Sequence, residues 1–372
     1  MIKTSIKFLD LKSEINEIKE EIQKSFEKII YTNTNFILGE ELLTFEKNFS
    51  KYINTNYCIG VGNGTDALEI AINSLNLKED DEIITQANTF ISSCLGITTN
   101  KNKINLVDIN PDTYQLDLDL LEKSITPKTK VVLIVHLTGS CCNMDKLMDI
   151  INKHNLILIE DCAQSHGAYF KNKRLGTFGL LSTFSFYPGK NLGAFGDGGA
   201  ICTNDKNIFN KILKIRNIGS IEKYKHELIG RNSRLDTLQA SVLDIKLKRL
   251  DINNEKRRKN AELYNKLLQN INEVELPLIE KDCIPVYHLF IIKCKKRDEL
   301  SEYLKNENIE TGIHYPCSIP ELTCYENQFN KNLFKNSIQN SKKILSLPMY
   351  PNLPEEHIKL VCKKIISFYS SL

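Results

Sequence analysis

One lysine, Lys190, stands in an unusual setting within the stretch STFSFYPGKNLGAFGDGGA, residues 182–200. It follows a Pro-Gly turn and precedes a run of glycines, whereas most lysines lie on solvated surfaces. A lysine held in a partly desolvated pocket has a lowered pKa, and its neutral amine can form a Schiff base. The glycines that follow would let the backbone pass close beside a flat ligand. Lys190 is therefore a candidate for covalent chemistry, although a surface lysine on a turn would also explain it when it is considered alone.

A carboxylate, Asp161, ends the apolar run LILIED and is expected at the carboxyl edge of a strand, half buried. A buried carboxylate needs a positive partner, or it takes up a proton. The protonated ring nitrogen of a cofactor would supply that positive charge. An arginine partner or a helix cap is the alternative interpretation.

A third group is the stretch GNGTDAL, residues 62–68, in which two glycines precede Thr65 and Asp66 at the expected start of a helix. The free N–H groups of a helix start bind anions such as phosphate. The hydroxyl of Ser185, five residues before Lys190, could bind the same phosphate. The stretch is neither a G-x-G-x-x-G fingerprint nor a Walker A loop, and an ordinary N-cap remains the alternative.

These three groups together form the set that pyridoxal phosphate requires: a phosphate site, a carboxylate for the ring nitrogen and a lysine for the Schiff base. Each group follows a different strand-like run in the sequence. The sequence therefore predicts a pyridoxal phosphate site in which Lys190 carries the cofactor.

The elements that must position these groups lie between about residue 55 and residue 205, where short apolar runs alternate with helical patterns. Runs such as YCIGVG, VVLIVHL and LSTFSF are typical of buried strands. Such strands, separated by helices, predict an α/β fold with a parallel or mostly parallel sheet covered on both faces. Ligands bind beyond the carboxyl ends of the strands in sheets of this kind.

Two domains are expected. The first, residues 1–250, includes an amphipathic N-terminal helix from Leu11 onward and the sheet. One long helix from Arg234 to about Ile271 is expected to lead out of it. A mixed α/β segment with the strand-like run VYHLFIIKC and a closing helix then predicts a smaller C-terminal domain, residues 251–372.

Composition argues against several classes of function. The 372 residues carry a net charge of only +3, with lysines scattered among acids, so nucleic-acid binding is not expected. No apolar run reaches 18 residues and the N-terminus is too charged for a secretory signal, which predicts a cytoplasmic protein with no membrane span. The 11 cysteines show no C-x-x-C spacing, which is typical of a reduced cytosolic protein. His314 lies three residues before Cys317, but this pair is not expected to bind zinc, and no metal site is predicted.

Six motifs carry a family resemblance: FLDL, GNGTDAL, EDCAQSHGA, SFYPGKNLGAFGDGGA, GRNSRLDTLQA and GIHYP. In this order, from about residue 8 to residue 316, they resemble the DegT/DnrJ/EryC1/StrS family of pyridoxal phosphate aminotransferases, which act on nucleotide-linked keto-deoxysugars. The resemblance implies the type I aminotransferase fold. That fold has a large domain around a seven-stranded mixed sheet, a smaller C-terminal α/β domain and a homodimeric assembly.

The resemblance also implies a role for each matching residue. Lys190 would hold the cofactor and move the proton between substrate and cofactor, and Asp161 would keep the pyridine nitrogen protonated. Gln164 would bond the ring hydroxyl oxygen, and Phe90 would stack on the ring. The phosphate would be held by Gly64, Thr65, Asp66 and Ser185.

Further positions would face the substrate or the second subunit. Asn232 resembles the residue that reaches the phosphate of the neighbouring subunit, so the active sites would be shared, although an Asx-turn would also explain an asparagine there. The sugar nucleotide would be met by Tyr187, His314, Tyr315 and, from the partner subunit, Tyr224. His166 is expected to be structural, since Lys190 is available as the base.

The implied reaction moves an amino group from L-glutamate to a nucleotide-linked keto-6-deoxysugar. The lysine motif is more similar to the branch of the family that acts on 3-keto sugars, and a 4-keto sugar is the alternative. A sugar dehydratase of the same fold would carry histidine in place of Lys190. A dinucleotide oxidoreductase would need a G-x-G-x-x-G motif, and a non-enzymatic regulator would be expected to have lost Lys190 or Asp161.

Overall fold

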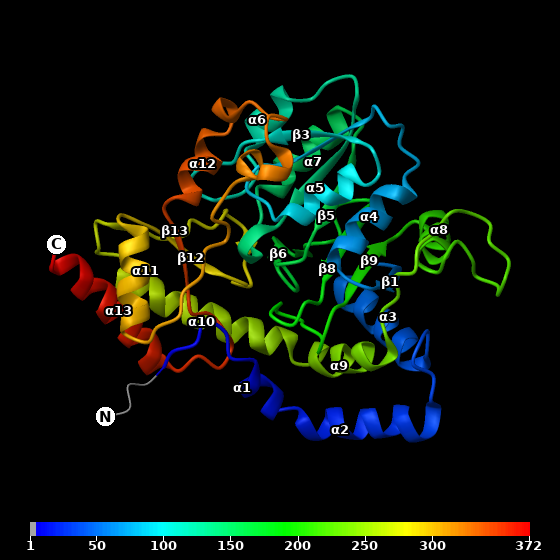
Figure 1. Cartoon of the computed structure of the whole chain (residues 1–372), viewed down its shortest axis with the longest axis horizontal. Helices are drawn as coiled ribbons and strands as arrows, with labels where there is room; N and C mark the ends of the chain where they lie inside the picture. Colours follow the sequence, from blue (N-terminus) through cyan, green and yellow to red (C-terminus); the bar gives the residue numbers. More distant parts are fainter. Residues whose placement is uncertain (1–4) are drawn as a thin grey trace.

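The central element is a seven-stranded sheet, seen in the computed structural model, which describes residues 5–372 (Figure 1). Its strands are β1 (Tyr57–Val61), β2 (Glu82–Gln86), β3 (Lys103–Val107), β4 (Thr129–Val135), β5 (Ile157–Asp161), β8 (Leu181–Ser185) and β9 (Gly199–Thr203). They lie in the order β1-β9-β8-β5-β4-β2-β3. Strand β9 runs antiparallel to both of its neighbours and the other pairs are parallel. The prediction of a seven-stranded mixed sheet is therefore confirmed.

Helices cover both faces of this sheet, because alternate strand residues point to opposite sides. On β4, Val132 and Ile134 belong to one core cluster, with α3, α7 and α9, whereas Val131 and Leu133 belong to another, with α4 and α8. The helices of this region are α3 (Glu40–Ile53), α4 (Gly64–Ser74), α5 (Ile91–Thr98), α6 (Leu118–Lys123), α7 (Met144–Lys153), α8 (Lys206–Arg216) and α9 (Thr237–Leu247).

Two helices that the sequence predicts as continuous are interrupted. The N-terminal helix is divided into α1 (Leu11–Asn16) and α2 (Lys19–Lys28) at Ile18, whose side chain turns into a small core against α9. The expected helix from Arg234 to Ile271 is α9 followed by α10 (Leu250–Leu268), with a turn between them. The two halves pack on different partners, α9 on α3 and α10 on α13 (Glu355–Ser370).

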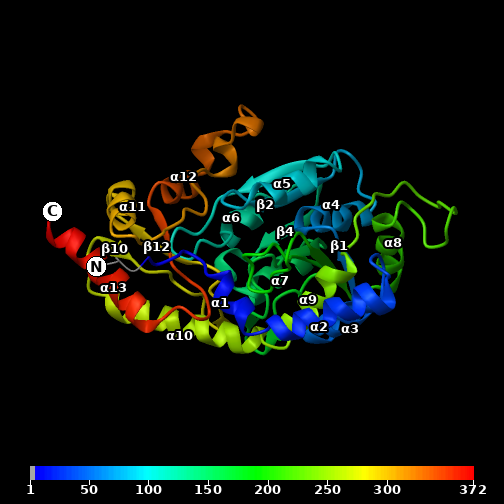
Figure 2. The ribbon, with the colours of Figure 1, turned by 60° about the horizontal axis from the view of Figure 1, so that its bottom comes forward.

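The C-terminal part of the chain builds a second core (Figure 2). Its sheet consists of β10 (Val274–Glu275), β12 (Phe290–Cys294) and β13 (Ile344–Leu347), and its helices are α11 (Arg297–Asn306) and α13 (Glu355–Ser370). Helix α12 (Lys335–Ser341) packs elsewhere, through Ile338, on a cluster that includes Cys94 of α5 and Leu106 of β3. The end of α10 packs into the second core, as does Ile6 near the N-terminus. The smaller C-terminal α/β unit is thus present, and the boundary between residues 250 and 251 stays a prediction.

A third, small sheet joins the two parts. It pairs β11 (Cys283–Ile284) with β6 (Tyr169–Phe170), which in turn pairs with β7 (Lys173–Arg174). All 11 cysteines are free thiols. None of the helices within residues 5–372 combines the length and the apolar character that crossing a bilayer requires.

Candidate active site

The carboxyl ends of β2, β4, β5 and β8 open into a cavity of about 520 Å³. This volume lies in the range of small-molecule sites, and the position is where α/β sheets bind ligands. Ten of the residues that the sequence assigns to cofactor or substrate line it: Gly64, Thr65, Asp66, Phe90, Asp161, Gln164, Ser185, Tyr187, Lys190 and Tyr315. Residues separated by more than 200 positions in the chain thus meet in one cavity.

Asp161 ends β5 and is only 6% exposed. Its carboxylate accepts hydrogen bonds from the N–H of Ala163 (3.1 Å) and the hydroxyl of Ser93 (3.1 Å). Burial raises the pKa of Asp161 above its ordinary value, although the Ala163 N–H, Lys190, Ser93 and His136 all oppose this effect. A carboxylate in this state is stabilised by any further cation that enters the cavity.

Lys190 lies in the turn after β8, where its own N–H donates to the carbonyl of Tyr187 (2.8 Å). Burial lowers the pKa of its ammonium to about 8, and only Asp161 acts in the opposite direction. Among residues 5–372, no acceptor or ion-pair partner lies within bonding distance of its Nζ atom. A lysine amine that is readily deprotonated and has no competing partner is suited to nucleophilic attack on a carbonyl carbon.

The start of α4 and Ser185 form a close cradle. Asn63 caps the helix, accepting a hydrogen bond from the N–H of Asp66 (2.8 Å), so the N–H groups of Gly64 and Thr65 remain for a ligand. A Cβ atom at Gly64 would lie 2.5 Å from Cβ of Ser185. Only glycine therefore allows the helix start and the Ser185 hydroxyl to approach the same point, which is the arrangement that a phosphate needs.

The side chain of Asp66 is directed elsewhere. Its carboxylate accepts a hydrogen bond from the Ser233 hydroxyl (2.6 Å) and pairs with Arg231 (3.1 Å). Because its own N–H is bonded to Asn63, Asp66 supports the loop 231–233 more directly than it supports an anion. Asn232 lies between Arg231 and Ser233 in this loop; it is exposed and does not line the cavity of its own subunit.

Phe90, Gln164 and Tyr315 surround the region between Asp161 and the mouth of the cavity. The rings of Phe90 and Tyr315 lie 5.4 Å apart. The amide of Gln164 accepts a hydrogen bond from the N–H of Thr138 (2.7 Å) and donates one to the hydroxyl of Tyr315 (3.1 Å). These contacts fix the amide, so that its orientation toward a ring in the cavity is set by the protein.

The residues predicted to meet the substrate differ in position. Tyr187 lines the cavity and is 61% exposed, as a group at its mouth should be. His314 does not line it; its ring stacks on Phe8 and its Nδ1 atom pairs with the hydroxyl of Ser346 (2.9 Å). Tyr224 is 83% exposed and lies in the loop after α8, which projects from the body of the molecule in Figures 1 and 2. Both Tyr224 and Asn232 thus lie outside the cavity of their own subunit.

Sequence reasoning missed several polar residues of the cavity. Ser93 is the main one, since its hydroxyl bonds Asp161 and is itself linked to Thr89 (2.8 Å). Both lie in TFISS, the stretch from which the sequence singled out Phe90 alone. The signal was their place at the start of a helix directly after β2, because that edge of the sheet faces the site.

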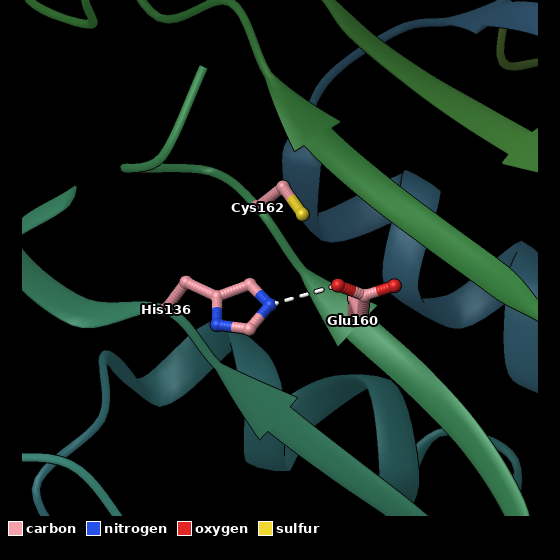
Figure 3. A group of neighbouring side chains, drawn as sticks. All are labelled: His136, Glu160 and Cys162. Carbon is pink, nitrogen blue, oxygen red and sulfur yellow. Dashed lines mark hydrogen bonds and ion pairs between the residues drawn. The ribbon is translucent and has the colours of Figure 1, made fainter. Parts of the chain in front are cut away.

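A second polar group, formed by the buried side chains of His136, Glu160 and Cys162, lies at the ends of β4 and β5 (Figure 3). The spacing of these side chains is compatible with metal ligands, but both Glu160 oxygens are already in use. They accept four hydrogen bonds, from His136 Nε2 (3.0 Å) and from the N–H groups of Gly176, Phe178 and Gly179. The arrangement fits a structural carboxylate that ties β5 to the segment before β8.

The cavity fits pyridoxal phosphate on three independent observations. Gly64 leaves room for a phosphate between the helix start and Ser185, Asp161 is a buried carboxylate short of positive charge, and Lys190 is a buried amine without a partner. When bound, the group would supply a carbonyl carbon for the lysine and a ring that withdraws electrons from the substrate. Asp161 would stabilise the protonated ring nitrogen, and Ser185 with Gly64 and Thr65 would hold the phosphate.

Comparison with known proteins gives consistent matches along almost the entire chain. The model of the DegT/DnrJ/EryC1/StrS aminotransferase family matches residues 16–366. The chain is 40% identical, over 97% of its length and 98% of the relative's, to a dTDP-3-amino-3,6-dideoxy-alpha-D-galactopyranose transaminase of Aneurinibacillus thermoaerophilus. It is also 37% identical, over 98% and 99% of the two chains, to a pleiotropic regulatory protein of Geobacillus stearothermophilus.

The fold has a similar match among solved structures. The crystal structure of S. venezuelae DesV in complex with a ketimine intermediate superimposes with a TM-score of 0.95 at 36% identity, and 98% of each chain is covered. The overall fold is therefore shared, over nearly the whole chain, with a protein of known structure.

Proposed function

Because this chain belongs to the DegT/DnrJ/EryC1/StrS aminotransferase family, we propose that it moves an amino group from L-glutamate to a nucleotide-linked 3-keto-6-deoxysugar. The chain is a pyridoxal phosphate-dependent aminotransferase of type I fold that acts on sugar nucleotides. The proposal adds the carbon that is aminated, the amino donor and the residues that carry the reaction.

The observation that supports these residue roles is the presence of Lys190 and Asp161 together in one cavity. Lys190 has a pKa lowered to about 8, so a substantial fraction of its amine is unprotonated near neutral pH and can accept a proton from substrate. Burial raises the pKa of Asp161, so its anionic form gains stability when a cation is bound beside it. An acid or base with a pKa near the working pH is the one that transfers protons most effectively.

Two features support a 3-keto sugar. The relative from A. thermoaerophilus is named for a 3-amino product, and the lysine motif SFYPGKNLGAFGDGG is similar to that branch of the family. A 4-keto sugar nucleotide is the alternative within the same chemistry. L-glutamate is proposed as donor from the family resemblance.

We further infer a homodimer in which each subunit completes the cavity of the other. The loop between α8 and α9 exposes Ile221, Tyr224 and Ile229 by 61%, 83% and 97%. Apolar side chains exposed together on one loop usually mark a protein contact. In a symmetric dimer this loop would carry Tyr224 and Asn232 to the partner's cavity, where the first would meet the sugar nucleotide and the second the phosphate.

The absorption spectrum of the purified protein with pyridoxal phosphate tests the cofactor chemistry. A band near ~420 nm is expected, and addition of L-glutamate should replace it with a band near ~330 nm. The Lys190→Ala variant should show neither the band nor its conversion. The converted enzyme is then offered 3-keto and 4-keto sugar nucleotides separately, and recovery of the first band with the 3-keto sugar alone would support the proposal.

The same experiment distinguishes the alternatives. Recovery with the 4-keto sugar alone would reassign the aminated carbon. A band that does not respond to L-glutamate or to either sugar would favour a regulator, the function for which the G. stearothermophilus relative is named.

A further inference from the structure

A buried network of amide and imidazole groups lies next to the turn that carries Lys190, residues 187–190, called here the catalytic turn. Asn191 follows Lys190 and is only 6% exposed. Its Nδ2 atom donates to Oδ1 of Asn254 on α10 (2.9 Å) and to the carbonyl of Val286 (3.0 Å), and its Oδ1 atom contacts Nδ1 of His288 (3.2 Å). Three hydrogen bonds of one side chain are thus directed at segments that lie more than 60 residues away in the chain.

The network has a defined hydrogen-bond direction. The carbonyl of Val286 can only accept, so the Asn191 amide must present its NH₂ group there and its oxygen to His288. Asn254 likewise donates to the carbonyl of His166 (2.8 Å), which leaves its own oxygen for Asn191. His288 must therefore carry its proton on Nδ1, because the Asn191 oxygen accepts and does not donate.

The charged and titratable groups around Lys190 come from several elements. Asp161 at the end of β5 is the carboxylate that raises the pKa of Lys190. The positive charge of Lys190 lowers the pKa of three histidines. They are His166 after β5, His288 before β12 and His314 between α11 and β13. Burial, then Lys190, lowers the pKa of His166 to about 3 and of His314 to about 4, and the pKa of His288 falls well below its ordinary value.

All three imidazoles are therefore neutral at physiological pH, and burial is the main cause of the lowered pKa of Lys190. A lysine has a long and flexible side chain, so burial persists only if its backbone turn is held in place. Asn191 attaches this turn by its side chain to α10 and to the segment before β12.

We propose that Asn191 is a positioning residue for Lys190: it attaches the catalytic turn to α10 and to residues 286–288, fixes His288 as the Nδ1–H tautomer, and so holds the lysine amine buried at the cavity. Asn191 acts on the reaction only through Lys190, so its importance for catalysis rests on the proposed function. The effect of Asn191 on the Lys190 amine does not rest on the proposed function, and it can be measured without cofactor or substrate.

The test is the pH dependence of Lys190 acetylation by acetic anhydride in the cofactor-free protein, read by mass spectrometry of the peptide that contains Lys190. The wild-type midpoint is expected near 8. In Asn191→Leu the turn loses these three hydrogen bonds, and we expect water to reach the amine. The midpoint should rise by one unit or more toward the ordinary lysine value of about 10.4, an at least tenfold loss of reactive amine near pH 8.

Asn102→Leu is the matched control, because Asn102 is 5% exposed and its Nδ2 atom donates to the carbonyl of Lys78 (2.7 Å), remote from the cavity. It should leave the Lys190 midpoint unchanged. If Asn191→Leu does not fold, His288 provides a second pair. His288→Asn keeps a donor near the position of Nδ1 and should keep the midpoint within half a unit of wild type, whereas His288→Leu should raise it.

The outcomes separate two questions. A wild-type midpoint near 8 that Asn191→Leu and His288→Leu leave in place would overturn the positioning role, whatever the enzyme does with sugars. A wild-type midpoint near 10.4 would overturn it as well, since there would be no buried amine to hold. A midpoint that moves as expected in a protein that aminates no sugar nucleotide would support the positioning role and contradict the proposed function alone.

Discussion

Two adjacent carboxylates at the end of β5, Glu160 and Asp161, have pKa values that the protein shifts in opposite directions. Glu160 is fully buried, and although burial alone would raise its pKa, His136 and the N–H groups of Gly179 and Gly176 lower it below its ordinary value. Asp161 is almost as buried but has fewer donors, and its pKa is raised. Successive strand residues point to opposite faces, so the two carboxylates face different surroundings one residue apart.

This difference distinguishes a structural carboxylate, Glu160, from one that we propose acts on a ligand, Asp161. Glu160 has all its partners inside the protein, so it stabilises the folded chain and has nothing to offer a ligand. Asp161 lacks part of its charge compensation, which a bound cation would supply. Both side chains are buried carboxylates, and the main difference between them is the number of hydrogen-bond donors, four around Glu160 and two around Asp161.

The largest effect should follow from removing the charge of the functional carboxylate. In Asp161→Asn, the rate of amino transfer from the proposed donor, L-glutamate, should fall roughly 10³-fold, as when a preorganised electrostatic partner is lost from other active sites. Single-turnover absorption measurements at saturating pyridoxal phosphate would report this rate. A variant that binds the cofactor and retains wild-type rate would contradict the role of Asp161.

The second effect concerns the structural carboxylate. Glu160→Gln removes the charge that four donors share and places an NH₂ group against backbone N–H groups. The free energy of unfolding should fall by about 3 kcal/mol, the magnitude seen when one partner of a buried charged network is removed. Urea titration of the cofactor-free protein measures it. Asp161→Asn serves as the control, because it should not destabilise the cofactor-free protein.

The third prediction compares the same two variants across acidic pH. Glu160 has a lowered pKa in the folded state, so its stabilising contribution is complete above its unfolded pKa of about 4.3 and is lost as pH falls through the folded pKa. Asp161 has a raised pKa, so its ionisation destabilises the fold progressively as pH rises from about 3.9 through the folded pKa.

Relative to wild type, the stability of Glu160→Gln should therefore decrease as pH rises from 3 to 6, and that of Asp161→Asn should increase. Urea titrations at several pH values in this range, without cofactor, would give both slopes. Two slopes of the same sign would show that the protein does not distinguish the two carboxylates as the hydrogen bonds suggest.

Much of this site could be predicted from sequence, because its parts follow strands. Lys190, Asp161 and the start of α4 each come directly after a recognisable strand, and parallel strands bring such positions to one edge. The count of donors around Glu160 and Asp161 could not be predicted, since it depends on the N–H groups of residues 176–179 and on Ser93 from another helix. The breaks at Ile18 and after Leu247 were missed for a related reason, because local helical periodicity does not show which neighbour each half will pack on.

The smallest effect should come from a change in the proposed phosphate cradle, formed by the start of α4 and Ser185. Backbone N–H groups differ in the same way as the two carboxylates, because some have a partner within the protein and others do not. The N–H groups of Gly176, Phe178 and Gly179 are used by Glu160, whereas those of Gly64 and Thr65 have no acceptor among residues 5–372. Gly64→Ala keeps the helix, since alanine is a good helix former and the backbone there is helical. Its Cβ atom, however, would lie 2.5 Å from Cβ of Ser185, so the cradle must widen.

Gly64→Ala should therefore weaken pyridoxal phosphate binding about tenfold, which corresponds to ~1.4 kcal/mol. Because the added Cβ atom meets Cβ of Ser185, the free energy of unfolding of the cofactor-free protein should also fall, by about 1 kcal/mol. Equilibrium titration of the cofactor absorption band measures the affinity. Ser185→Ala removes the hydroxyl without adding bulk, and Ser185→Gly in the Gly64→Ala background removes the atom that the new methyl group meets. If the double variant binds no more tightly than Gly64→Ala, the close approach of the helix to Ser185 is not what limits the phosphate site. Partial recovery would instead show that the open N–H groups of α4 bind the phosphate as soon as the cradle can close.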